Sequence, residues 1–218
     1  MNRSTDSAPA GLAGYARRAA LPALIVAAVL VTVVVPQFFP ADGGPTGFDR
    51  AVGEHIHSSF DGHAGIYRVL VAPSDALVVT GLLFAGVAWF AYRRQWWQAG
   101  FVLIAPEFAI GVNALLLKPL WDRPLENYLA YPSGHTVHLV AVVTAFALAS
   151  ESARVRVTVA VVMAVVLPVV LVGMVGMGYH YPSDVVGGAA AAVALVAAGY
   201  LPVRYCALRA DRRPRSPR

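Results

Sequence analysis

Hydrophobic residues in this chain gather in six long runs, and most charged residues lie in the short segments between them. A helix needs about 20 apolar residues to cross the hydrocarbon core of a bilayer, and each run is close to that length. The runs are apolar at nearly every position, whereas the strands of a membrane barrel alternate in polarity. We therefore predict an all-α, polytopic membrane protein, a six-transmembrane-helix bundle. The predicted spans are residues 19–39, 71–92, 99–117, 134–150, 157–177 and 184–203.

The composition supports this class of protein. Of the 218 residues, 58% are hydrophobic and 13% are charged, whereas a soluble domain carries roughly 25% charged residues. The first run is too long for the apolar core of a signal peptide and lacks a small-residue cleavage site, so we interpret it as an uncleaved helix. The single cysteine, Cys206, excludes a disulfide within the chain, and we favour a small apolar filler over a palmitoylation site.

The distribution of cations predicts the orientation of the bundle, because cytoplasmic segments are enriched in Lys and Arg. One set of segments holds 13 cations, at positions 3, 17, 18, 93, 94, 154, 156, 204, 209, 212, 213, 215 and 218. The opposite set holds 4, at positions 50, 68, 118 and 123. Both termini are thus predicted to be cytoplasmic and all six histidines to lie outside. Because the basic residues flank apolar runs, they indicate topology rather than a nucleic-acid partner.

Three regions follow from this topology. Residues 1–18 are predicted to be a cytoplasmic segment, residues 19–203 the membrane domain, and residues 204–218 a basic, disordered cytoplasmic tail. Within the domain, residues 40–70 form the longest segment between spans. Apolar residues recur there at four-residue spacing from Phe48 to Phe60, which predicts an amphipathic helix lying in the outer interface.

Three polar islands interrupt the apolar pattern on the predicted outer side, at residues 118–124, 131–135 and 180–184. In the last island His180 and Asp184 are four residues apart and share one face of a helix. An aspartate can fix the tautomer of a histidine and raise the basicity of its other nitrogen. The alternative is an ordinary helix start with Asp184 as the capping residue.

The other two islands add groups suited to an anion. Ser133 and Gly134 are predicted to begin a helix whose N-terminal N–H groups bind phosphate, with His135 in the first turn as a proton donor. Lys118, the only lysine, and Arg123 supply positive charge. The alternatives are simple capping by Ser133 and a lysine reaching the lipid headgroups.

Together the islands resemble the type 2 phosphatidic acid phosphatase superfamily over about residues 70–203. Residues 132–135, Pro-Ser-Gly-His, match its second motif, and His180 with Asp184 matches the end of the third. The resemblance implies a metal-independent reaction without a cofactor, through a phosphohistidine on His180. It further implies that Asp184 orients this nucleophile and that His135 is the general acid. The phosphate oxygens would be held by Lys118, Ser133 and Gly134.

Two positions depart from the family pattern. Leu125 and Met174 stand where the family has phosphate-binding arginines. Arg123 is our candidate to replace part of the charge missing at Leu125. Arg50 or Arg68 could replace the charge missing at Met174 if the outer segment folds over the site. Losing one such contact costs roughly 2–4 kcal/mol of transition-state stabilisation. The chain is accordingly a slower enzyme, uses a different clamp, or has lost catalysis.

The resemblance implies hydrolysis of a lipid phosphate or diphosphate in a bacterial plasma membrane, with a polyprenyl carrier or a phospholipid monophosphate as substrate. The alternatives are a non-catalytic protein that binds or translocates lipid phosphates, and a lipid phosphotransferase. The expected partners are the lipid substrate and membrane lipids; the oligomeric state does not follow from the sequence. We favour structural roles for Glu107 and His138, and we do not expect a zinc site at His55, His57 and His63.

Overall fold

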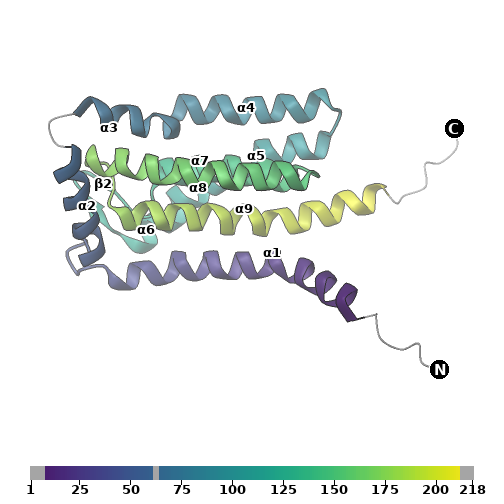
Figure 1. The fold of residues 1–218 in the computed structure, drawn as a ribbon, viewed down its shortest axis with the longest axis horizontal. Helices are drawn as coiled ribbons and strands as arrows, with labels where there is room; N and C mark the ends of the chain where they lie inside the picture. Colours follow the sequence, from purple (N-terminus) through teal and green to yellow (C-terminus); the bar gives the residue numbers. More distant parts are fainter. Residues whose placement is uncertain (1–7, 61–63, 212–218) are drawn as a thin grey trace, which may run out of the picture.

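The computed structural model describes residues 8–60 and 64–211, and it is almost entirely helical (Figure 1). The α-helices are α1 (Ala8–Val34), α2 (Gly47–Phe60), α3 (Ala64–Val71), α4 (Ala76–Tyr92), α5 (Trp96–Val112), α6 (Lys118–Trp121), α7 (Gly134–Ala149), α8 (Ala153–Gly176) and α9 (Pro182–Asp211). Short 3₁₀ turns lie at Val35–Phe38 and Ala72–Ser74, and a π-helical turn lies at Asn113–Leu117. A two-stranded antiparallel hairpin joins β1 (Pro124–Leu125) to β2 (Tyr128–Leu129).

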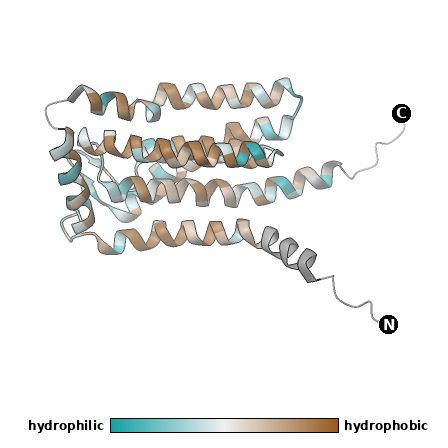
Figure 2. Ribbon diagram, viewed as in Figure 1, coloured by the Kyte–Doolittle hydropathy of each residue, from teal (hydrophilic) through white to brown (hydrophobic). Residues whose placement is uncertain are grey.

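The long helices run side by side, and the polar elements collect at one end of the bundle. Figure 1 shows α2 lying across that end, close to α6 and the hairpin, while α1 begins and α9 ends at the opposite end. In Figure 2 the long helices are mostly hydrophobic, and hydrophilic residues concentrate toward the ends. This arrangement brings the three polar islands of the sequence to the same end of the molecule.

Within residues 8–60 and 64–211, five helical segments are long and apolar enough to cross a membrane. They are Ala19–Phe38, Gly65–Tyr92, Trp96–Trp121, Ala153–Gly176 and Pro182–Ala207. The predicted span at 134–150 is the shorter apolar helix Gly134–Ala149, with 16 residues. The fold is thus all-α and membrane-like, and the number of six spans stays a prediction.

The last helix extends into the C-terminal segment that we predicted to be disordered. Helix α9 continues to Asp211, so the tail predicted to be disordered from residue 204 is helical over its first eight residues. Alanine, leucine and arginine in this stretch are strong helix formers, and Pro202 precedes it without ending the helix. Residues 212–218, like residues 1–7 of the predicted N-terminal segment, lie outside the described residues.

Two glycines of α9 let the second island approach the helix closely. A Cβ atom on Gly187 would lie 2.1 Å from the ring of Tyr131, and one on Gly188 would lie 2.8 Å from the carbonyl oxygen of Ser133. The Tyr131 hydroxyl in turn donates to the carbonyl of Thr32 on α1 (2.7 Å). The small residues of the last helix therefore fix the loop before α7 against the start of α9.

Helix α2 confirms the helix predicted from Phe48 to Phe60, and a capping box defines its start. The Thr46 hydroxyl accepts from the N–H of Asp49 (3.1 Å), and the Asp49 carboxylate accepts from the N–H of Thr46 (2.9 Å). This reciprocal pair satisfies two of the N–H groups that a helix N-terminus leaves without partners. On the other face of α2, Ile56 is buried with Tyr67 and Val175 in a small cluster that joins the helix to α3 and α8.

Candidate functional site

A cavity of about 650 Å³ opens at the polar end of the bundle, between the starts of α4 and α7 and the loop before α9. Its polar lining brings together residues from all three islands: Lys118, Gly134, His135 and His180. Asp75, His138, Tyr128 and Tyr179 complete the polar wall. Two imidazoles, a lysine and a helix N-terminus therefore face one shared space, which suits the binding of an anionic group.

His135 and His180 approach each other across this cavity although 45 positions separate them in the chain. Their ring centroids lie 6.3 Å apart, with an angle of 71° between the planes. His135 stands in the first turn of α7, and His180 immediately precedes the turn that opens α9. The close packing of Gly187 and Gly188 described above holds these two helix starts together, so the fold sets the separation of the rings.

Asp184 lies behind His180, as expected for residues four apart. Its Oδ2 is 3.6 Å from Nδ1 of His180 and accepts the N–H of Tyr181 at 2.9 Å. Among the described residues Nδ1 of His180 is buried without a hydrogen-bond partner. The pair is thus adjacent but beyond hydrogen-bond distance, and a buried ring nitrogen without a partner is uncommon in folded proteins.

A π-helical turn places Lys118 at the cavity. Asn113–Leu117 interrupts the α-helical pattern at the end of α5, and Lys118 follows it directly. Such turns occur often at functional sites, because they redirect the side chains that follow. The Lys118 ammonium donates to the carbonyl of Leu129 and lies 5.9 Å from the centre of the Tyr128 ring. Asn113 donates to the carbonyl of Pro132 (3.3 Å), which ties the turn to the second island.

Arg123 has a different environment from the one we predicted. Its side chain is buried, with 1% of the residue exposed, and all five N–H groups of a guanidinium are matched by protein acceptors. Those acceptors are the carbonyl oxygens of Gly43 (3.0 Å) and Gly44 (2.8 Å), Oγ of Ser183 (2.8 Å), Oδ1 of Asp184 (2.7 Å) and Oδ2 of Asp49 (3.0 Å). No N–H is left for a phosphate oxygen, so Arg123 supports the site from behind.

The aromatic and acidic groups around Arg123 complete a closed network. The guanidinium carbon lies 3.8 Å from the centre of the Phe39 ring and 4.6 Å from that of Tyr181. Burial would raise the pKa of Asp49, but hydrogen bonds from Thr46, Ser183 and Arg123 outweigh it and lower that pKa below the ordinary value of 3.8. Asp49 is therefore ionised at neutral pH and neutralises part of the charge of Arg123.

Asp49 was missed by the sequence analysis, although it links the outer segment to the site. Besides Arg123, it accepts both the N–H and the hydroxyl of Ser183 at 2.8 Å. A sequence signal for its position exists in the spacing Thr46-x-x-Asp49, which is a capping box. The spacing predicts the helix start; the contact with Ser183, 134 positions away, follows only from the tertiary fold.

Ser133 and Met174 also lie behind the cavity. Ser133 is buried and caps α7 by accepting the N–H of Thr136 at 3.5 Å. Its hydroxyl contacts the sulfur of Met174 at 3.8 Å. Met174, at one of the two positions that depart from the family pattern, is thus a fully buried apolar group against the capping serine. Of the residues predicted to hold phosphate, Lys118 and Gly134 line the cavity.

Glu107 and His138 form a pair at the edge of the site. Nε2 of His138 lies 3.2 Å from Oε1 of Glu107, and the glutamate side chain is half exposed. His138 lines the cavity one turn after His135. Of the three histidines considered for zinc, His63 lies outside the described residues. The part of the chain that the structure describes contains no cluster of three His, Cys, Asp or Glu residues suited to a metal ion.

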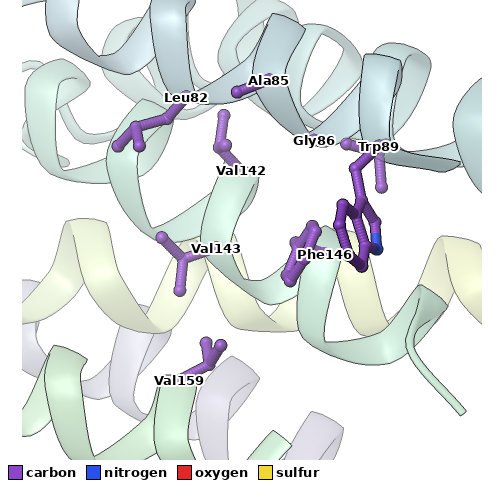
Figure 3. Close-up of a pocket in the computed structure, with 9 residues that line it drawn as sticks. Leu82, Ala85, Gly86, Trp89, Val142, Val143, Phe146 and Val159 are labelled. Carbon is purple, nitrogen blue, oxygen red and sulfur yellow. The ribbon is translucent and has the colours of Figure 1, made fainter. Parts of the chain in front are cut away.

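An apolar cleft of about 330 Å³ lies farther along the same helices. Figure 3 shows Leu82 and Trp89 of α4, Val142 and Phe146 of α7, and Val159 of α8 around it. Helices α4 and α7 also supply Ala76 and His138 to the polar cavity, so the two spaces follow one another along the same pair of helices. A molecule with a polar head and an apolar tail matches this sequence of surfaces.

Comparison with known proteins identifies one family. The family model described as PAP2 superfamily matches residues 117–207, a segment that contains Lys118, His135, His180 and Asp184. No curated protein and no solved structure matches the chain.

Proposed function

Because residues 117–207 of this chain match the PAP2 superfamily, we propose that it hydrolyses a lipid phosphate or diphosphate through a phosphohistidine intermediate. The superfamily points to phosphatase activity on lipid phosphates. The observation that carries the proposal is the approach of His135 and His180, with ring centroids 6.3 Å apart in one cavity. This spacing leaves room for a phosphorus atom between a nucleophile on one side and an acid on the other.

In the proposed reaction the lone pair of Nε2 of His180 attacks phosphorus, and the bond from phosphorus to the lipid oxygen breaks. That oxygen takes a proton from His135 and leaves as an alcohol or a lipid monophosphate. Water then attacks the phosphohistidine, gives a proton to His135 and releases inorganic phosphate as the P–N bond breaks. Together the two half-reactions return both histidines to their starting protonation states.

Asp184, Lys118 and Gly134 have supporting roles in this proposal. Asp184 accepts a hydrogen bond from Nδ1–H of His180 once the present separation of 3.6 Å shortens, and this hydrogen bond fixes the tautomer with Nε2 free to attack. Lys118 contributes a point charge, and the N–H groups at the start of α7, from Gly134 onward, bind phosphate oxygens. This set differs from the one expected from sequence in leaving out Arg123 and Ser133.

The position of the cavity supports a lipid substrate. The apolar cleft beside α4 and α7 (Figure 3) accommodates a hydrocarbon tail while the phosphate lies between the histidines. Either a polyprenyl carrier or a phospholipid monophosphate has this form.

The placement in the membrane is part of the proposal. The loop after α4 and the first turn of α8, at the end opposite the cavity, carry Arg93, Arg94, Arg154 and Arg156, and the positive-inside rule assigns that end to the cytoplasm. The active site then faces the outer side of a bacterial plasma membrane, within a single membrane domain over residues 19–203.

Two alternative functions use the same site. Leu125 and the buried Met174 leave the site with fewer cations than the family pattern, which favours binding or translocation of a lipid phosphate without turnover. A phosphotransferase shares the first half-reaction and differs only in the acceptor that replaces water.

The test measures phosphate release by the purified protein from a panel of lipid monophosphates and diphosphates. We expect turnover by the wild type and a radiolabelled phosphohistidine after acid-free quenching. His180→Gln abolishes both signals; His135→Gln slows phosphate release by about 10²–10⁴-fold, the usual contribution of a general acid. His55→Gln, on the exposed face of α2, serves as the matched control and retains activity. Full activity in His180→Gln would remove the proposed nucleophile, and binding without turnover would favour the first alternative.

A further inference from the structure

The cavity of about 650 Å³ has few positively charged side chains for a phosphoryl-transfer site. Among the described residues that line it, Lys118 is the only lysine or arginine, and Asp75 contributes a negative charge. A transferred phosphoryl group spreads negative charge over three oxygens, and its stabilisation depends on positioned cations. Arg123, the nearest candidate in sequence, has all its donors engaged by protein acceptors.

A second cavity, of about 290 Å³, lies on the other side of His180. Helix α2 forms one wall with Arg50, and the hairpin residue Leu125 forms part of another. His180 therefore borders both cavities, so side chains from each of them approach the residue that carries the phosphoryl group in the proposed reaction.

Arg50 is held in this cavity by the network around its neighbour. Asp49 fixes the start of α2 to Ser183, three residues after the nucleophile, through hydrogen bonds of 2.8 Å. Within the described residues the Arg50 side chain makes one hydrogen bond, from Nη1 to the carbonyl of Pro45 (2.6 Å), and no ion pair. The rest of its guanidinium is available to an anion, although Glu54 and His57 line the same cavity.

We propose that Arg50 is the second cation of the active site and contacts oxygens of the phosphoryl group on His180; this rests on the proposed function. It supplies, from an outer segment that the family match does not cover, the charge missing at Leu125. Leu125 and Arg50 line one cavity, so an arginine at either position has access to the same space. A guanidinium suits this role because it donates two parallel hydrogen bonds to a phosphate.

The experiment compares Arg50→Gln with Arg68→Gln, which removes an exposed arginine from α3 that does not line either cavity. Binding of orthovanadate is measured by calorimetry in detergent, and kcat and KM are measured with a short-chain lipid phosphate. We expect Arg50→Gln to weaken vanadate binding at least tenfold and to lower kcat by about 10²–10³-fold, the usual loss for one oxyanion donor. Arg68→Gln stays within twofold of the wild type in both measurements.

Moving the positive charge from position 50 to position 125 tests whether Arg50 contacts the anion or has only a structural role. In the double variant Arg50→Gln/Leu125→Arg we expect vanadate binding to recover at least threefold over Arg50→Gln alone. Vanadate affinity unchanged in Arg50→Gln overturns the inference, whatever happens to activity. Wild-type protein that binds vanadate through Arg50 but turns over no lipid phosphate refutes the proposed hydrolysis and leaves the anion contact standing.

Discussion

The buried network around Arg123 makes a quantitative prediction for Asp49→Asn. The substitution preserves the shape of the side chain but removes its charge. It also replaces one acceptor oxygen by an amide group that faces other donors, among them the N–H of Thr46 at 2.9 Å and the Arg123 guanidinium at 3.0 Å. Both side chains of the ion pair are fully buried, so water does not compensate for the loss.

The expected magnitude follows from this burial. Removing one partner of a buried ion pair costs about 3–5 kcal/mol, because the remaining charge stays uncompensated in a poorly solvated site. Arg123 keeps its second ion pair, to Asp184 at 2.7 Å, which limits the loss to the lower part of that range. We therefore expect the free energy of unfolding to fall by about 3 kcal/mol.

The pH dependence gives an independent check with a defined sign. The pKa of Asp49 in the folded protein is below its ordinary value of 3.8. A group with a lowered pKa stabilises the folded state above its unfolded pKa, and this contribution is lost as the pH falls through the folded pKa. The stability difference between the wild type and Asp49→Asn should therefore be full at pH 6 and shrink below about pH 4.

Equilibrium unfolding in mixed detergent micelles measures both quantities. Asp42→Asn is the matched control, because Asp42 lies in the loop before α2 and is exposed. Among the described residues its carboxylate accepts only the N–H of Gly44 (2.9 Å), which an asparagine oxygen also accepts. Its stability should stay within about 0.5 kcal/mol of the wild type. If Asp49→Asn is equally close to the wild type at pH 6, the network does not hold α2 to α9 as argued.

Two further predictions concern packing and chemistry. Gly187→Ala places a methyl group 2.1 Å from the Tyr131 ring and should cost about 1–3 kcal/mol, whereas Gly81→Ala, with open space around its Cβ, should not destabilise the protein; equal stability of the two variants would contradict the close approach. Phosphate release should persist in EDTA, as a phosphohistidine mechanism without a metal requires, and inactivation that added Mg²⁺ or Zn²⁺ reverses would show that a metal takes part.

The hydrophobic pattern predicted the helices better than their ends. The apolar runs reappear as α1, α4, α5, α7, α8 and α9 because burial in lipid or in the bundle core sets their position along the chain. Helix ends depend on local hydrogen bonds that composition does not specify. One example is the π-helical turn at Asn113–Leu117, which carries the helix on to Trp121.

The sequence identified residues that lie together at the candidate site, but it did not predict the environment of each one. The approach of His135 and His180 agrees with their position in the predicted islands, because each island begins a helix at the same end of the bundle. The environment of Arg123 was not predictable, since its acceptors Gly43 and Asp49 lie 80 and 74 positions earlier in the chain. From its position beside a motif we predicted that Arg123 binds the substrate phosphate. In the structure, acceptors within the protein take all of its N–H groups.

The proposed reacting groups and the groups that hold them come from different parts of the chain. Lys118, His135 and His180 all lie in the segment that matches the family, whereas Asp49 and the carbonyls that accept from Arg123 lie before it. A buried guanidinium needs every donor satisfied and its charge balanced, and each unmatched group costs about 1–3 kcal/mol. Residues 43–49 are therefore required wherever Arg123 is buried, and the same segment brings Arg50 to the nucleophile. In this chain the segment before α3 thus contributes to the proposed active centre besides connecting two spans.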